Sequence, residues 1–400
     1  MSKLNELIKE LCPNGVEYYK LGDIGQFFGG LTGKSKSDFS DGNAKFISYR
    51  NVYSNPALNI DTEDKVKISD GERQNTLQYG DIIFTGSSET PDECGISSVV
   101  TKETIEKMYL NSFCFIFRLN NPQMLLPDFS KHLFRSEKLR YQLGKTASGV
   151  TRYNVSKKLM ANVTIPVPPL EVQREIVRIL DNFTELTAEL TAELTARKQQ
   201  YAYYRDKLLT FGDVRGGATS DVVWKTLAEI ADISTGSSNT DDAVEGGCYP
   251  FFVRSQQLLA KDEYEYDEEA IITAGDGVGV GNVFHYINGK YALHQRAYRI
   301  HPATDGLLGK YLYHYFVATF PKYIGQQMYQ GSVPSIRRPM LNKFQVAIPS
   351  LDVQSRIVNV LDNFDAICTD LSSGLPAEIE ARQKQYEYYR DKLLSFEEKI

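Results

Sequence analysis

The chain is an internal duplication, and this feature limits its possible folds more than any other. Residues 165–183 read IPVPPLEVQREIVRILDNF, and residues 346–364 read VAIPSLDVQSRIVNVLDNF. A second pair of similar blocks follows, YAYYRDKLLTF at 201–211 and YEYYRDKLLSF at 386–396. Repeated units of this kind bury their apolar faces against equivalent neighbours. The sequence therefore predicts a pseudo-two-fold molecule in which one folding plan is used twice.

A weaker repeat opens each half of the chain. VEYYKLGDI at 16–24 is similar to VVWKTLAEI at 222–230, but the segments between these openings and the conserved blocks diverge almost completely. Neutral drift of a structural repeat would not be confined to the middle segments. Conserved ends with dissimilar middles are what a protein would need to read two different half-sites.

The expected fold class is α+β, with two globular domains joined and separated by two long helices that form an antiparallel coiled coil. A chain of 400 residues is long enough for two or three domains. We expect a first domain at 1–165, a central helix at 166–213, a second domain at 214–347 and a C-terminal helical region at 348–400.

The conserved blocks carry the spacing of a helical seam. Apolar residues in the central block recur at steps of three and four, with one extra four-residue step, a stutter, in TAELTAEL at 187–194. At ~1.5 Å per residue, a helix from Leu170 to Phe211 would be roughly 60 Å long and would act as a spacer. The residues predicted to form the helix contacts are Ile176, Phe183, Leu186, Leu190, Leu194 and Tyr204 in the first seam and Ile357, Phe364, Ile367 and Tyr389 in the second.

Two questions about the seams stay open at this point. Ser372, Ser373, Gly374 and Pro376 interrupt the second seam, which predicts a break or kink near 372–376. The two seams are expected to pair with each other, but each could instead pack on its own domain.

The divergent middles have the patterns of compact α+β units. One helix per domain is expected at 129–143 and 308–320. The segments expected to form strands, bounded by turn residues, are 44–50, 81–86, 113–119, 269–275 and 291–300.

The distribution of charge along the chain is a better indicator of phosphate binding than the net charge of -6. Residues 138–158 hold six basic residues and no acidic one, and residues 321–343 hold four basic residues and no acidic one. A single patch of this kind is as readily a solvated loop. Two patches at equivalent points of a repeat favour phosphate binding.

The remaining composition favours a soluble cytoplasmic protein without a membrane segment. No apolar stretch approaches a membrane span. The five cysteines are far apart and never in a C-x-x-C arrangement, which favours reduced core thiols over disulfides or zinc.

No catalytic motif or metal site is predicted. GGLTGKS at 29–35 resembles a phosphate-binding loop, but Phe28 stands where the motif requires glycine. GDGVGVG at 275–281 precedes HYINGKYAL instead of a helix, so a hairpin or a DNA-facing loop is favoured over a dinucleotide cradle. The histidines lack metal-ligand spacing, and no G-x-S-x-G sequence is present.

The paired blocks PPLEVQREIV and IPSLDVQSRIV, the two YYRDKLL ends and the TAEL repeats resemble the specificity subunits of type I restriction-modification systems over essentially the whole chain. The resemblance implies a non-catalytic, cytoplasmic subunit that serves defence against foreign DNA. Each variable domain, a target-recognition domain, would read one half of a bipartite asymmetric site in double-stranded DNA. The helices would set the spacer and dock two modification subunits, and restriction/translocase subunits would complete the assembly. S-adenosylmethionine, ATP and Mg are expected on those partners and no cofactor in this chain.

Polar side chains on loops are the expected readers of base edges in the major groove. The candidates in the first domain are Arg50, Asn51, Lys145, Ser148, Thr151, Arg152, Tyr153 and Asn154. Those in the second domain are Arg254, Gln256, Gln295, Arg296, Gln330, Ser332, Arg337 and Arg338. The alternative is a non-catalytic coiled-coil scaffold or oligomerisation protein without DNA specificity, which would not need basic loops in both middles.

Overall fold

The computed structural model describes residues 2–211, 222–327 and 334–399. The chain divides into two compact units, of which the first comprises Met1–Leu190 with Ile379–Ile400 and the second comprises Thr191–Glu378. The central helix α7 (Leu170–Leu209) contributes to both units, as does the last helix α12 (Leu375–Leu393). The long helix predicted from the seam spacing is therefore confirmed.

The globular part of the first unit contains four small sheets. Their strand orders are β1-β12, β10-β11-β6, β2-β9-β5-β7 and β4-β3-β8. The strands are β1 (Tyr18–Lys20), β2 (Gly25–Gly29), β3 (Ala44–Ile47), β4 (Lys65–Val66), β5 (Ile82–Thr85), β6 (Ser87–Ser88), β7 (Ser97–Val99), β8 (Met108–Leu110), β9 (Cys114–Leu119), β10 (Ala147–Ser148), β11 (Tyr153–Val155) and β12 (Thr164–Pro166).

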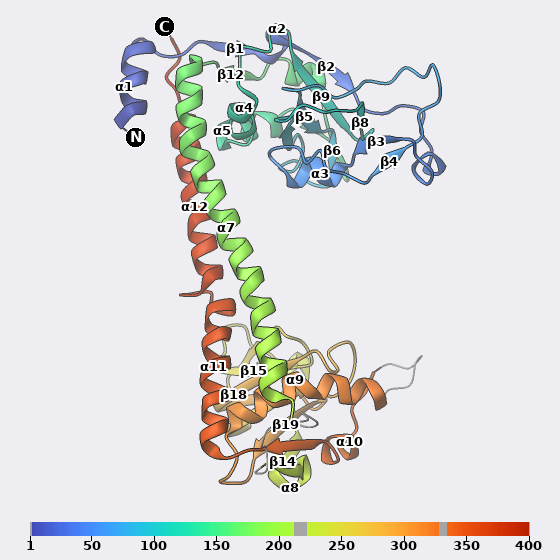
Figure 1. Cartoon of the computed structure of the whole chain (residues 1–400), viewed down its shortest axis with the longest axis vertical. Helices are drawn as coiled ribbons and strands as arrows, with labels where there is room; N and C mark the ends of the chain where they lie inside the picture. Colours follow the sequence, from blue (N-terminus) through green and yellow to red (C-terminus); the bar gives the residue numbers. More distant parts are fainter. Residues whose placement is uncertain (1, 212–221, 328–333, 400) are drawn as a thin grey trace, which may run out of the picture. The chain divides into compact units, whose positions relative to one another are not determined.

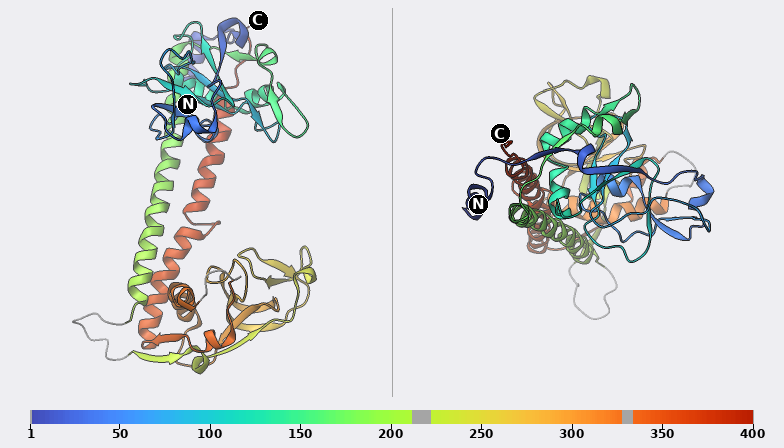
Figure 2. Two further views of the ribbon diagram at one scale, coloured as in Figure 1. Left: turned by 90° about the vertical axis from the view of Figure 1, so that its right-hand side faces the viewer. Right: turned by 90° about the horizontal axis from the view of Figure 1, so that it is seen from above.

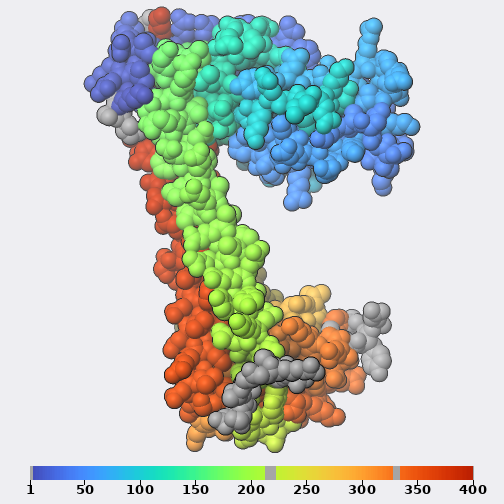
Figure 3. All heavy atoms as spheres, in the orientation of Figure 1, coloured from blue at the N-terminus to red at the C-terminus, as the bar shows by residue number. Residues whose placement is uncertain are grey.

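The first unit also contains short helices. They are α1 (Ser2–Leu11), α2 (Leu21–Ile24), the 3-10 helix η1 (Lys36–Phe39), α3 (Tyr49–Ser54), α4 (Pro127–Leu133), α5 (Glu137–Gly144) and α6 (Lys157–Met160). In the space-filling view, α1 (dark blue) lies against the start of α7 (green) (Figure 3). Lys3 of α1 forms an ion pair with Glu175 of α7 at 3.5 Å.

The second unit is built on one larger sheet with the order β14-β19-β17-β18-β15-β16, and a separate pair β13-β20. The strands are β13 (Val223–Thr226), β14 (Ala231–Thr235), β15 (Tyr249–Phe252), β16 (Leu259–Lys261), β17 (Tyr266–Ala274), β18 (Phe284–Leu293), β19 (Ala297–Pro302) and β20 (Gln345–Ile348). The helices are α8 (Leu227–Ile230), the 3-10 helix η2 (Thr240–Asp242), α9 (Gly309–Gln327), α10 (Arg338–Asn342) and α11 (Leu351–Thr369).

The duplication is visible in the way each unit is closed. β1 pairs antiparallel with β12 directly before α7, and β13 pairs antiparallel with β20 directly before α11. A short helix, α2 or α8, follows the first strand of each pair. The sequence echo between 16–24 and 222–230 is therefore the first strand and short helix of this closing element.

A buried glutamine fixes each conserved helix to its domain. The side-chain amide of Gln173 donates to the carbonyls of Met124 and Pro168 and accepts from the amide of Leu126, at 2.8–2.9 Å. Gln354 makes the same three contacts with Gly306, Pro349 and Leu308 at 2.8–2.9 Å. Both glutamines are fully buried, so these hydrogen bonds satisfy polar groups that water does not reach.

A histidine–aspartate contact also occurs once in each unit. His132 Nε2 lies 2.8 Å from Asp181 Oδ1, and His314 Nε2 lies 2.9 Å from Asp362 Oδ1. A lysine pairs with each aspartate, and these pairs are Lys131 with Asp181 and Lys310 with Asp362.

The helices pair antiparallel within each unit, as predicted. In the first unit, Phe183 of α7 stacks on Tyr389 of α12 with ring centroids 5.3 Å apart. In the second unit, Tyr204 of α7 stacks on Phe364 of α11 at 5.8 Å. The end of α7 and α11 lie side by side in both views of the ribbon (Figures 1 and 2).

The seams also pack on the domains, which was the alternative interpretation. Val172, Ile176 and Leu180 belong to the core of the first unit, and Ile357 and Leu361 belong to that of the second. Each conserved helix thus uses one set of apolar residues for its domain and a neighbouring aromatic residue for the other helix.

The predicted break in the second helical region is confirmed. α11 ends at Thr369 and α12 begins at Leu375, with Pro376 in its first turn. A Cβ atom at Gly374 would lie 2.7 Å from the carbonyl oxygens of Ala366 and Asp370, so only glycine fits there.

Several local predictions were wrong in detail. Tyr49 and Arg50 begin α3 instead of extending β3, and the helix predicted at 129–143 is the two helices α4 and α5. The strand predicted at 291–300 is interrupted by a turn between β18 and β19, and α9 runs through Pro321 beyond its predicted end.

Candidate nucleic-acid interface

The basic segment of the first domain forms a hairpin on a three-stranded sheet. Ser148 ends β10, Tyr153 and Asn154 lie in β11, and Thr151 and Arg152 lie in the connecting turn. β11 in turn pairs with β6, with Asn154 opposite Ser87. The turn is exposed, and the sheet gives it a defined position.

Arg152 is held over a hollow of about 620 Å³. Its Nη2 donates to Ser87 Oγ at 3.0 Å, and its guanidinium lies over the Phe113 ring at 5.0 Å from the centroid. Both contacts are with neutral groups. They orient the guanidinium without neutralising its charge.

Arg50 and Thr151 line the same hollow as Arg152, so the structure brings three candidates together. Lys145 stands at the end of α5, where its ammonium lies 4.0 Å from the centroid of the Tyr141 ring. Asn51 is engaged within the chain, because its amide donates to the Asn59 carbonyl at 2.7 Å and accepts from the Asn59 amide at 3.2 Å.

Acidic and aromatic residues that sequence reasoning missed also line the hollow. Glu93 accepts hydrogen bonds at 2.9 Å from Ser88 Oγ and from the Tyr53 hydroxyl. These bonds hold the pKa of Glu93 below its usual 4.5. A carboxylate and an exposed arginine that line the same hollow offer both an acceptor and a donor to base edges. No sequence pattern joins residues 50, 93 and 152.

In the second domain, two of the candidate arginines share one carboxylate. Arg254 Nη1 donates to Asp276 Oδ1 at 2.5 Å, and Arg296 Nη1 lies 3.4 Å from Asp276 Oδ2. Gln295 donates from its side chain to Asn239 Oδ1, and its backbone amide donates to the Ser238 carbonyl at 2.9 Å. Gln256 is exposed in the segment after Arg254.

The second basic segment lies beside these residues. Ser335 forms a β-bridge with Asp276, and exposed Arg337 and Arg338 follow at the start of α10. Gln330 and Ser332, which were also predicted, lie outside the described residues.

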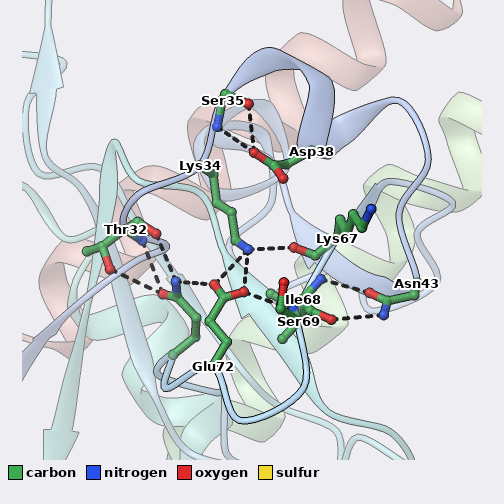
Figure 4. A network of polar contacts seen from close by, with 10 residues as sticks. Thr32, Lys34, Ser35, Asp38, Asn43, Lys67, Ile68, Ser69 and Glu72 are labelled. Carbon is green, nitrogen blue, oxygen red and sulfur yellow. Dashed lines mark hydrogen bonds and ion pairs between the residues drawn. The ribbon is translucent and has the colours of Figure 1, made fainter.

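The loop that resembles a phosphate-binding motif has a structural role. Lys34 Nζ donates to the Lys67 carbonyl at 2.6 Å and pairs with Glu72, while Gln74 bridges to Thr32 (Figure 4). Hydrogen bonds from Lys34, the Ser69 amide and Gln74 lower the pKa of Glu72 to about 2. The lysine that would contact a phosphate is therefore committed to an internal ion pair.

Within residues 2–211, 222–327 and 334–399, no group of three or more His, Cys, Asp or Glu side chains is placed to hold a metal ion. Cys12, Cys94, Cys114 and Cys368 are buried free thiols, whereas Cys248 is exposed. Burial raises the pKa of Cys114 to about 12, so it is no nucleophile. Among the described helices, none combines the length and the apolar character that crossing a membrane requires.

Comparison with known sequences agrees with this organisation. The family described as the type I restriction modification DNA specificity domain matches residues 13–197 and again 219–381. The chain is 37% identical over 268 residues to the EcoR124I/EcoR124II specificity subunit of Escherichia coli, a match that covers 60% of this chain and 65% of that protein. It is 30% identical over 249 residues to a putative type I specificity subunit, S.MpnORF201P, of Mycoplasma pneumoniae, covering 60% of this chain and 99% of that one.

Solved structures share the fold at low sequence identity. The S subunit of a type I restriction-modification system from M. genitalium matches with a TM-score of 0.58 and 14% identity, over 95% of this chain and 96% of that one. A chain from a study of assembly and conformational transition of the type I R-M system matches with a TM-score of 0.64 and 18% identity, over 96% of this chain and 98% of that one. Because the family match covers both halves of the duplication, the chain belongs to the family of type I restriction-modification DNA specificity subunits.

Proposed function

We propose that this chain is the non-catalytic DNA-reading subunit of a type I restriction-modification complex. Each globular domain reads one half of a bipartite asymmetric site in double-stranded DNA. The paired helices set the distance between the half-sites and dock two modification subunits. Those partners supply S-adenosylmethionine and adenine methylation, and restriction/translocase subunits supply the ATP- and Mg-dependent steps.

One contrast carries the proposal. The buried contacts of the frame repeat between the two units, as with Gln173 and Gln354, whereas the exposed arginine-bearing surfaces differ completely. Arg152 is held by a hydroxyl and an aromatic ring, and Arg254 is held by a carboxylate. Two unlike polar surfaces on one repeated frame are suited to two unlike base sequences.

A scaffold without DNA specificity would not need this arrangement. Its exposed surfaces could be polar without positioning arginines beside hydrogen-bonding partners. The full match of the duplicated halves to a DNA specificity family also favours sequence reading over simple oligomerisation.

The test is reconstitution of this chain with the modification subunits of its source organism. We expect the assembled complex to methylate adenines in a site with two short specified blocks and an unspecified spacer. The chain alone should neither methylate nor cleave DNA with any of these cofactors. Methyl transfer by the isolated chain, or a single contiguous site for the complex, would overturn the proposal.

A further inference from the structure

The glycine-rich turn at 275–281 connects β17 to β18 and is hydrogen-bonded to two other segments of the candidate DNA surface. The Gly275 amide donates to the Arg296 carbonyl at 2.8 Å, and the Ile336 amide donates to the Gly275 carbonyl at 2.8 Å. The Gly277 amide donates to the Pro334 carbonyl at 2.9 Å. The turn is therefore bonded to the segments that carry Arg296 and Arg337.

Its glycines allow this close approach. A Cβ atom at Gly275 would lie 2.6 Å from the Arg296 carbonyl oxygen, and one at Gly279 would collide with the Arg254 carbonyl oxygen. Gly277 has a φ of +80°, which is unfavourable for other residues. The motif thus serves backbone packing around the arginines.

Asp276 is the charged residue of this turn. Its side chain is 27% exposed, and its two oxygens face Arg254 and Arg296, which are 40% and 61% exposed. Each guanidinium has five N–H donors, so most donors of both side chains stay available after pairing with Asp276. An exposed ion pair contributes little to folding stability, which leaves orientation as the larger effect of this carboxylate.

We propose that Asp276 is a positioning residue that holds Arg254 and Arg296 ready to read bases in the second half-site. The proposal rests on the proposed function of this surface. Arginine loses rotamer freedom when it binds, and fixing it beforehand reduces that cost. The negative charge also offsets part of the local positive charge, which weakens attraction to phosphates of any sequence. Asp276 therefore favours discrimination between base sequences over affinity for DNA of any sequence.

The test uses Asp276→Asn in the complete complex, with Asp267→Asn as the matched control. Asp267 is exposed near the start of β17, the strand that leads into the turn, and loses the same charge when substituted. Binding is measured by competition with duplexes that carry single base changes in either half-site, at two salt concentrations. Thermal unfolding of each variant shows whether it is folded.

For Asp276→Asn we expect discrimination in the second half-site to fall by about tenfold, the scale of one base contact. Discrimination in the first half-site should stay unchanged, and affinity for unrelated DNA should stay equal or rise. Asp276→Glu, which keeps a carboxylate, should restore part of the discrimination. In the background of Arg254→Ala with Arg296→Ala, the change Asp276→Asn should have no further effect on discrimination.

Unchanged discrimination in a folded Asp276→Asn complex would overturn the inference, as would an equal loss in both half-sites. If Asp276→Asn fails to fold, the folded Asp276→Glu variant decides, because its longer side chain displaces the carboxylate. A loss of discrimination confined to the second half-site supports the inference, whereas unchanged discrimination or an equal loss in both half-sites overturns it. Absence of any sequence discrimination in the unaltered complex would instead contradict the proposed function itself.

Discussion

The hydroxyl of Tyr386, in the last helix of the chain, lies 2.8 Å from Nδ1 of the buried His132 in the first domain. Because His132 Nε2 faces Asp181, the neutral histidine carries its proton on Nε2 and accepts the tyrosine hydrogen bond at Nδ1. In the second unit His314 has the same aspartate contact, but its Nδ1 is buried with no hydrogen-bond partner among the described residues. The C-terminal repeat therefore completes a polar network in the first unit that has no counterpart among the described residues of the second.

Tyr386→Phe should lower the stability of the first unit by about 1–3 kcal/mol, because it leaves a buried acceptor without a donor. Tyr388→Phe is the matched control, since Tyr388 is 60% exposed and its loss should cost less than about 0.5 kcal/mol. Native-state hydrogen exchange of the two units measures both effects. Equal protection in the two variants would show that the Tyr386 hydroxyl contributes nothing.

Stability should fall as the pH drops below about 6.5. Burial holds the pKa of His132 and of His314 below the usual 6.5. As the pH falls, the histidines of the unfolded chain bind protons at a higher pH than those of the folded chain. Their contribution to stability is therefore fully present above about pH 6.5 and declines below it. Asp181 does not titrate in this pH range. Burial raises its pKa, but the hydrogen bonds from His132 and Lys131 outweigh burial and keep the pKa below 3.8.

Urea midpoints between pH 8 and pH 5 measure this decline. The double variant His132→Gln with His314→Gln should show a flatter profile than the unaltered chain, and each single variant should be intermediate. A profile that keeps its full slope in the double variant would assign the acid sensitivity to other groups.

Gln173→Ala and Gln354→Ala should each destabilise one unit by about 3 kcal/mol or more. Each substitution leaves three backbone groups without their hydrogen bonds, one of them buried and the other two in partly buried contacts. Gln199→Ala, at an exposed position of α7, is the control. Hydrogen exchange should report the loss in the first unit for Gln173 and in the second for Gln354, and a loss spread over both units would argue against two separate clamps.

Arg152→Ala and Arg337→Ala should each weaken specific DNA binding by the complex by ~1–3 kcal/mol if the arginine reads a base, and by less if it contacts only phosphate. Each variant should relax one half-site and leave the other intact. Arg174→Ala, on the exposed face of α7, removes the same charge away from the candidate surfaces. Unchanged affinity in both test variants would mean that these loops are not the reading surface.

The repeated helices could be predicted from the sequence because the signals that specify them are local. The seam spacing, the glycine and proline at 374 and 376, and the paired YYRDKLL blocks each act within a few residues along the chain. The roles of Asp276 and Glu93 could not be predicted, because their partners come from strands and turns that only the folded chain brings together. Asn51 was also treated as a free reader, whereas its amide holds the loop at Asn59 through contacts that no local pattern reveals.

The TAELTAEL segment offers a test of the helix as a spacer. It lies in α7 between Phe183, which stacks on Tyr389, and Tyr204, which stacks on Phe364. Inserting one more TAEL after Leu194 lengthens the helix by ~6 Å and rotates it by about 40°, because four residues slightly exceed one turn of ~3.6. Both stacked pairs lie outside the insertion, and the segment between α11 and α12 is not helical.

We therefore expect the variant to fold and to keep both half-sites, while the unread spacer grows by one or two base pairs at ~3.4 Å per step. Sequencing of methylated sites in cells that carry the insertion measures the spacer directly. An insertion of the same length in an exposed loop, after Gly246, is the control, because it adds residues without lengthening α7. Retention of the old spacer in the TAEL variant, or an altered half-site, would show that α7 does not set the distance between the two readers.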